Sequence, residues 1–146
     1  MRSLDTNILL YATNADCPEH EAARRIIESA LAEPAEWIVA DQVYFELYRL
    51  LRNPAVLEQP LSAAQSADVI DYYRRRSGWG RCAWEPRLFS HLFPHLTTEN
   101  SKATHVFDLV LAFTLQDAGV STFYTRNTRD FAEVASFEVV NPIDAQ

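Results

Sequence analysis

The chain has 146 residues, of which 48% are hydrophobic and 12% aromatic, and its formal net charge at pH 7 is −7. This composition excludes a mainly disordered chain and predicts one compact domain that spans residues 1–146. The negative charge excludes a protein that coats nucleic acid indiscriminately, although an acidic protein can still carry a local basic groove.

Cys17 and Cys82 lack the close spacing of a zinc or redox motif. We therefore expect two free thiols in a reducing cytoplasm. The amino-terminal residues carry no apolar signal segment, because Asp5 and Asn7 interrupt them, and no stretch is long enough to cross a bilayer. These features predict a soluble cytoplasmic protein without membrane contact.

The first residues predict a short buried strand that ends at Asp5. Residues 8–11 continue as a helical turn, which Asn7 is able to cap. Apolar residues recur at helical spacing over residues 18–32, with a proline near the start of the helix. Residues 37–40 then predict a second short buried strand.

A further helix is predicted after Asp41, which suits an N-cap. Val43, Glu46, Leu47 and Leu50 follow at i, i+3, i+4 and i+7, so they share one face of this helix. Glu46 therefore points toward the apolar side of its helix.

Residues 62–76 are helical in composition and end in three consecutive arginines, which suit a helix C-terminus. Glycines and prolines interrupt residues 77–104, where we expect a short strand near residues 82–84 and a short helix near residues 88–91. This stretch has the weakest periodicity in the chain.

The helical pattern returns over residues 104–118, and Gly119 is its stop signal. Asp108 shares one stripe of this helix with Leu111, Ala112 and Leu115. Asp108 is therefore an acid on a face that is expected to be buried.

Residues 121–124 and 137–140 predict two more strands. Strands separated by helical segments indicate right-handed crossovers and a mainly parallel sheet that is covered on both sides. Ligands bind beyond the carboxyl ends of the strands in such sheets. Asp5 and Thr125 both lie at that edge.

Four isolated acids therefore stand at strand ends or on apolar helix faces: Asp5, Glu46, Asp108 and Asp130. Burying an unpaired carboxylate is costly. If these carboxylates converge, their mutual repulsion raises their pKa values or requires a cation, and a hard divalent metal is the simplest partner. The pattern predicts a hydrolytic site of the Mg²⁺ type.

Several of these segments resemble the PIN domain, and the closing Val139–Pro142 resembles the last strand of VapC-type toxins. The resemblance spans nearly the whole chain. It is carried by the order and spacing of Ser3–Tyr11, Glu46 within Phe45–Tyr48, Asp108 followed by Ala112–Gly119, and Thr125–Phe131.

The resemblance implies a three-layer α/β/α fold and an endoribonuclease that depends on Mg²⁺ or Mn²⁺, the toxin of a type II toxin–antitoxin pair. A cognate antitoxin and a homodimer are implied as well. Asp5, Glu46 and Asp108 match the family's acidic metal-binding positions. Where many members have a fourth aspartate this chain has Asn127, which supplies no charge, while Asp130 lies one helical turn later.

Four further residues are assigned supporting roles at this site. Asn7 would hold the Asp5 loop in position, and Thr125 would bind a phosphate or a water beside the acids. Arg126 and Arg129 are candidates for contact with RNA phosphate, with Trp79 or Trp84 available to stack on a base.

Other interpretations remain open for the same residues. Asp5 and Asn7 would serve as helix caps alone, Glu46 would pair with Arg49 or with an arginine elsewhere, and Asp130 would be a solvated turn residue. A catalytically silent interaction module with the same fold is one alternative function, and a metal-dependent DNA nuclease is another. A phosphatase of the haloacid dehalogenase type is disfavoured because Asn7 replaces the second aspartate of its Asp-x-Asp motif.

Overall fold

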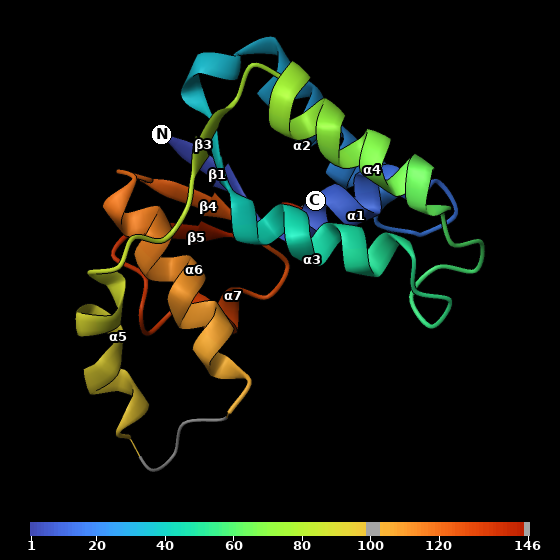
Figure 1. The fold of residues 1–146 in the computed structure, drawn as a ribbon. Coiled ribbons are helices and arrows are strands. Elements are labelled where there is room, and N and C mark those ends of the chain that lie inside the picture. Colours follow the sequence, from blue (N-terminus) through green and yellow to red (C-terminus); the bar gives the residue numbers. More distant parts are fainter. Residues whose placement is uncertain (99–102, 145–146) are drawn as a thin grey trace.

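The computed structural model describes residues 1–98 and 103–144, in which short strands alternate with helices (Figure 1). The strands are β1 (Arg2–Leu4), β2 (Ile38–Ala40), β3 (Gly80–Cys82), β4 (Thr122–Tyr124) and β5 (Glu138–Val140). The α-helices are α1 (Thr6–Thr13), α2 (His20–Ala32), α3 (Asp41–Leu51), α4 (Ala63–Asp71), α5 (Leu88–Leu96), α6 (His105–Asp117) and α7 (Thr128–Phe131). A 3-10 helix, η1 (Pro34–Glu36), precedes β2, and a π-helical turn, η2 (Tyr72–Arg76), extends α4.

The strands form a parallel arrangement, as the sequence predicted. β1 pairs with β4 and β4 with β5, while β2 pairs with β3, and each of these pairs is parallel. A parallel bridge between Arg2 and Trp37 joins the two groups. The strands therefore follow the order β3-β2-β1-β4-β5, and their carboxyl ends lie at one edge.

The starts of two helices differ from the prediction. Asp5, not Asn7, caps α1, because an Asp5 carboxylate oxygen accepts a hydrogen bond of 2.8 Å from the Thr6 amide. Asp41 is the first residue of α3 and makes no capping bond. Its two oxygens instead accept bonds of 2.7 and 3.1 Å from Arg74, since a two-pronged guanidinium contact competes well with a cap.

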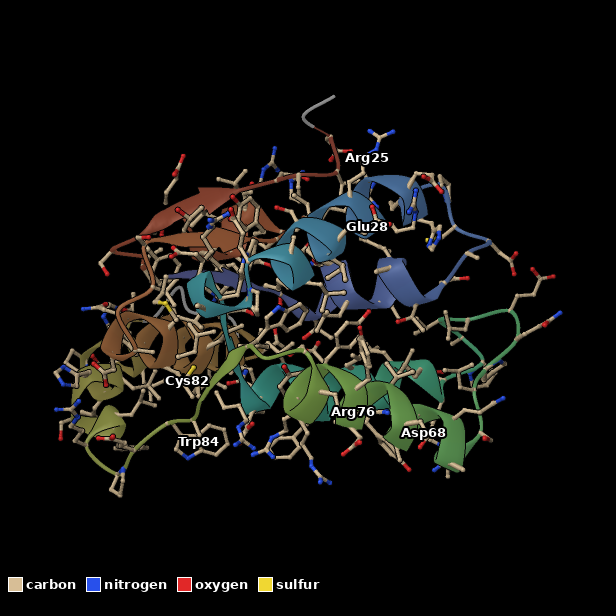
Figure 2. All side chains as sticks on the ribbon, turned by 90° about the horizontal axis from the view of Figure 1, so that it is seen from above. Arg25, Glu28, Asp68, Arg76, Cys82 and Trp84 are labelled. Atoms are coloured by element: carbon tan, nitrogen blue, oxygen red, sulfur yellow. The ribbon has the colours of Figure 1, made fainter. Side chains whose placement is uncertain are left out.

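Within residues 77–104, the described part of the chain differs from the prediction at two boundaries. β3 begins at Gly80, ahead of the expected residues 82–84, and α5 runs to Leu96 through Pro94. Buried Leu88 and Leu92, one turn apart, hold α5 against the protein despite the proline. Figure 2 shows the loop between β3 and α5 at the surface of the molecule.

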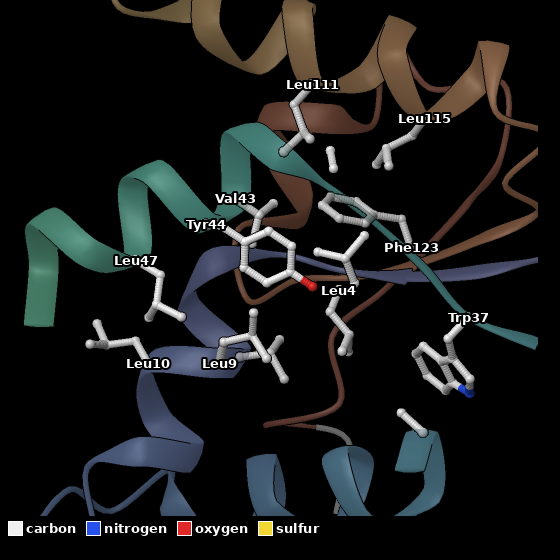
Figure 3. Close-up of a cluster of buried hydrophobic side chains, with 14 of the residues drawn as sticks. Leu4, Leu9, Leu10, Trp37, Val43, Tyr44, Leu47, Leu111, Leu115 and Phe123 are labelled. Atoms are coloured by element: carbon white, nitrogen blue, oxygen red, sulfur yellow. The ribbon is translucent and has the colours of Figure 1, made fainter. Parts of the chain in front are cut away.

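The protein has the three layers that the sequence predicted. Figure 3 shows Leu111 and Leu115 of α6 on one side of the strands and Leu9 and Leu10 of α1 on the other, with Phe123 of β4 between them. All five side chains are buried in one hydrophobic cluster. No helix within residues 1–98 and 103–144 has the length and apolar character needed to cross a membrane.

An aromatic contact positions the short helix α7 beyond the end of β4. The ring of Phe131 on α7 meets the ring of Phe123 edge to face, with centroids 5.0 Å apart, and Phe137 packs on Phe123 at 5.9 Å. A four-residue helix cannot hold itself together by its own hydrogen bonds. The position of α7 therefore depends on the burial of Phe131.

We expect Phe131→Ala to lower the free energy of unfolding by about 3–5 kcal/mol, because it opens a cavity in this cluster. Urea unfolding would measure the loss. Phe93→Ala is the matched control, since Phe93 is 55% exposed and Phe131 only 2%, and it should change the stability by less than about 0.5 kcal/mol. Equal losses in the two variants would contradict the role given to Phe131.

Candidate active site

The site lies at the carboxyl edge of the strands, where β1 and β4 run into loops. The Asp5 amide donates to the Tyr124 carbonyl at 2.9 Å, and the Thr125 amide donates to the Val140 carbonyl at 2.9 Å. These bonds continue the parallel ladders by one residue beyond the strands. Asp5 and Thr125 are therefore held side by side, at the edge where the sequence placed them.

Asp5 accepts hydrogen bonds from both loops at this edge. One carboxylate oxygen takes the bond from the Thr6 amide. The other accepts from the Thr125 hydroxyl at 2.6 Å and from the Asn7 side-chain amide at 3.3 Å. Asn7 also accepts from the Arg126 amide at 3.3 Å, so its side chain bridges the two loops.

Burial and nearby charge change the acidity of Asp5. The pKa of this carboxyl is raised from 3.8 to about 6, mainly by burial and also by the negative charges of Glu46 and Asp108, while the hydrogen bonds from Thr125 and Thr6 act in the opposite direction. Burial and the neighbouring negative charges therefore destabilise the ionised form of Asp5. A cation beside Asp5 would relieve that cost.

Glu46 reaches the site from α3, on a side chain that is neither fully buried nor fully exposed. The Thr6 hydroxyl donates to one Glu46 oxygen at 3.1 Å. No ion pair joins Glu46 to Arg49 within the described part of the chain, so the alternative pairing is not present. The sequence analysis assigned no role to Thr6, although its position directly after Asp5 indicated that it would lie near the site.

Asp108 projects from the first turn of α6 and is less deeply buried than predicted. Leu109, Leu111, Ala112 and Leu115 are buried, whereas 34% of the Asp108 side chain is exposed. Partial burial raises the pKa of its carboxyl, and so does the nearby charge of Asp130.

The ring of His105 contacts the Asp108 carboxylate across one helical turn. The ring nitrogen Nδ1 lies 3.4 Å from an Asp108 oxygen, and this contact acts against the rise in the pKa of Asp108. Sequence reasoning did not assign His105 to the site, although its spacing of i, i+3 from Asp108 was visible.

Asn127 and Asp130 both line the same cavity as the other acids. Asn127 precedes α7 and makes no side-chain capping bond, while its amide donates to the Thr125 hydroxyl at 3.0 Å. Asp130 lies in the first turn of α7, and of the two only Asp130 adds negative charge next to Asp108. Of the two candidates for the fourth acidic position, only Asp130 therefore supplies a negative charge.

Three residues assigned to RNA contact lie elsewhere than at the cavity wall. The Arg126 guanidinium donates hydrogen bonds to a Glu19 carboxylate oxygen at 2.5 Å and to the Tyr11 hydroxyl at 3.3 Å. Arg129 is exposed and does not line the cavity. Trp79 is buried and donates to the Ala30 carbonyl at 2.9 Å, so it has no free face on which a base would stack. Trp84 does line the cavity.

The acids stand around an open cavity of about 1180 Å³. Drug-sized ligands usually occupy cavities of roughly 300–1,000 Å³, so this one has room for a larger substrate. The described residues contain no group of three or more His, Cys, Asp or Glu side chains arranged to hold a metal ion. Mg²⁺ needs only one or two carboxylates besides its waters, and the pair Asp5 and Asp108, whose charges repel, fits that requirement.

Comparisons with known proteins agree with this architecture. The family model described as PIN domain matches residues 3–78. Ribonuclease VapC24 of Mycobacterium tuberculosis is 39% identical over 143 residues, which cover 98% of this chain and 97% of that protein.

Solved structures share the fold at lower sequence identity. M. tuberculosis VapC20, described as a toxin that cleaves the sarcin–ricin loop, has a TM-score of 0.70 and 15% identity, over 92% of this chain and 96% of that one. VapBC2 of Rickettsia felis, solved with a promoter DNA fragment, has a TM-score of 0.66 and 17% identity, over 96% of this chain and 97% of that one. The chain belongs to the PIN-domain family and, through its 39% identity with a VapC ribonuclease, to the VapC-type members of that family.

Proposed function

We propose that this protein is an endoribonuclease that hydrolyses RNA phosphodiester bonds with the help of Mg²⁺ or Mn²⁺. The observation that carries the proposal is the convergence of four acids from four elements, Asp5, Glu46, Asp108 and Asp130, on one cavity. The similarity to a VapC ribonuclease over nearly the whole chain supports the choice of RNA over DNA as substrate.

Asp5 and Asp108 are the proposed metal ligands, with Glu46 as a third acid beside them. A bound Mg²⁺ or Mn²⁺ would activate a water and neutralise charge that develops on the phosphate oxygens. Glu46 would accept a proton from the attacking water, and the Thr6 hydroxyl donates a hydrogen bond to one of its oxygens. Thr125 and Asn7 keep the Asp5 carboxylate oriented toward the cavity.

We further propose that residues 1–146 act as one PIN-like domain. The family match ends at residue 78, yet Asp108 and Asp130 lie beyond it and share the cavity with Asp5 and Glu46. Neither half of the chain would hold the complete set of acids. This arrangement supports a single catalytic unit.

The toxin role and the partner follow from the family. The structural neighbours include a toxin–antitoxin complex from Klebsiella pneumoniae, which shares 19% identity and a TM-score of 0.61. We propose that this chain is likewise the toxin of such a pair, that a cognate antitoxin covers the acidic cavity, and that the toxin forms homodimers.

Asp5→Asn and Asp108→Asn should each lower RNA cleavage in Mg²⁺ by at least about 100-fold, the scale of losing one electrostatic contact to the transition state. Cleavage of a labelled structured RNA measures the effect. Asp117→Asn is the matched control, because Asp117 is on the same helix as Asp108 and 34% of each side chain is exposed. Unchanged RNA cleavage in both site variants would contradict the assignment of Asp5 and Asp108 as metal ligands. Cleavage of DNA at the same rate as RNA would favour the DNA nuclease alternative.

The stability of the metal-free protein should fall as the pH rises through about 6. The folded-state pKa of Asp5 lies above its ordinary value of 3.8, so the stabilisation from protonation is complete below that value and is lost above about pH 6, a change of about 3 kcal/mol. Thermal melts over this range measure it. Asp5→Asn should reduce the dependence of the melting temperature on pH, and Asp117→Asn should leave this dependence unchanged.

Mg²⁺ should restore part of the stability that is lost at high pH. The metal binds the ionised carboxylate, so it should raise the melting temperature at about pH 8 and have little effect at about pH 5. Asp5→Asn should lose this response to Mg²⁺. An equal rise in melting temperature at both pH values would contradict binding at Asp5.

Asp130→Asn should weaken the response to Mg²⁺ and lower cleavage more than Asn127→Ala does. Asp130 supplies charge beside Asp108, whereas Asn127 supplies none. Isothermal titration with Mg²⁺ and the cleavage assay would compare the two variants. A larger loss in Asn127→Ala would reverse the assignment of the fourth position.

A further inference from the structure

The wall of the cavity beside the acids carries exposed aromatic rings. Phe45 of α3 is 68% exposed, Phe107 of α6 is 67% exposed, and Trp84, on the loop between β3 and α5, is 52% exposed. All three residues line the same cavity as the carboxylates, and Figure 2 shows Trp84 standing outward from its loop. Rings gathered beside a polar site and left open to water are typical of a binding surface.

A hydrogen bond joins the two helices that carry Phe45 and Phe107. The side chain of Gln42 on α3 donates to the Phe107 carbonyl at 2.9 Å. Gln42 lies one helical turn before Phe45, so this bond ties the segment that carries Phe45 to the start of α6. Phe45 and Phe107 therefore stand on elements that are joined directly at the cavity.

Arg49 is the one arginine or lysine among the described residues that line the cavity. It is exposed, and it forms no ion pair or hydrogen bond with any residue in the described ranges. It follows Phe45 by four residues and Glu46 by three on α3, which places its Cβ about 5–6 Å from theirs. A free guanidinium group beside an acidic site is suited to a phosphate.

We propose that Arg49, Phe45, Trp84 and Phe107 form a binding ledge for a single-stranded segment of RNA that flanks the cleaved phosphate. This inference rests on the proposed nuclease function and adds a substrate-binding surface to it. Arg49 binds a neighbouring phosphate, and the rings stack on bases. Bases of a duplex are already stacked on one another, so only an unpaired segment can use these rings.

Charge favours RNA over a second copy of the chain as the occupant. A second copy that covered the rings would also take Arg49 and the nearby carboxylates out of water, and an unpaired buried charge is costly. RNA supplies a phosphate for Arg49 and bases for the rings. A second copy of the chain therefore fits this surface less well than RNA does.

Tryptophan fluorescence gives a readout that does not depend on cleavage. Of the three tryptophans, Trp37 and Trp79 are buried and Trp84 is exposed. A short single-stranded RNA of mixed sequence, added with Ca²⁺ in place of Mg²⁺ to slow cleavage, should quench the emission of Trp84. Trp84→Phe should abolish the quenching. Binding of RNA by the wild type without any quenching would overturn the ledge.

The arginine is tested against a matched change on the same helix. Arg49→Ala should raise the Kd for this RNA about tenfold and reduce the salt dependence of binding by about 0.7 in slope, the contribution of one phosphate contact to a single strand. Arg52→Ala removes the same charge from α3, but Arg52 bonds to Tyr48 and does not line the cavity. Equal effects of the two changes would overturn the role of Arg49.

The rings are tested in the same way. Phe45→Ser and Phe107→Ser should each raise the Kd about tenfold, the loss of one stacked base. Phe93→Ser is the control, because Phe93 on α5 is exposed but does not line the cavity. In the cleavage assay, Phe45→Ser and Arg49→Ala should raise KM and leave kcat nearly unchanged.

These outcomes separate the ledge from the nuclease function. If the wild type cleaves RNA but Trp84 is not quenched and Arg49→Ala behaves like Arg52→Ala, the ledge is wrong and the nuclease function stands. If RNA quenches Trp84 but is not cleaved, the ledge holds and the nuclease function fails. If Phe45→Ser splits a dimer in sedimentation and RNA causes no quenching, a second copy covers the surface and the ledge is overturned.

Discussion

The site depends on one electrostatic constraint: carboxylates of like charge stand around a single cavity, and one of them, Asp5, is out of water. Burial and the charges of Glu46 and Asp108 raise the pKa of Asp5 to about 6. The hydrogen bonds from the Thr125 hydroxyl and the Thr6 amide act against this rise in the pKa. A divalent cation would relieve this repulsion between carboxylates, which is the physical basis for the proposed metal-dependent chemistry.

The parallel sheet makes this convergence possible. Because its strands end at one edge, the loops after β1 and β4 meet there, and α3, α6 and α7 each bring one acid to the same space. The packing of Phe131 on Phe123 keeps α7 in place. The same cavity has a second wall of exposed rings with Arg49 among them. The acids proposed for chemistry and the rings proposed for binding therefore line one cavity.

Local patterns predicted the strands and most helices, since periodicity and capping depend on neighbouring residues. They failed where a distant partner decided the outcome. Asp41 was predicted to cap α3, but Arg74, 33 residues away in sequence, takes both of its oxygens. Trp79 was a candidate for stacking on a base. It is buried, and its indole N–H donates to the Ala30 carbonyl, so it is not available for stacking. The extension of α5 through Pro94 depends on packing that the sequence pattern does not contain.

The sequence by itself determined the identity of the acids, their order along the chain and the faces of the helices that carry them, because these follow from spacing within single elements. The tertiary structure decided which charged groups meet. It set Asp130 beside Asp108, joined Thr6 to Glu46 across 40 residues, turned Arg126 toward Glu19 and left Arg49 free at the cavity. Such contacts arise from how separate elements pack, and no local pattern records that packing.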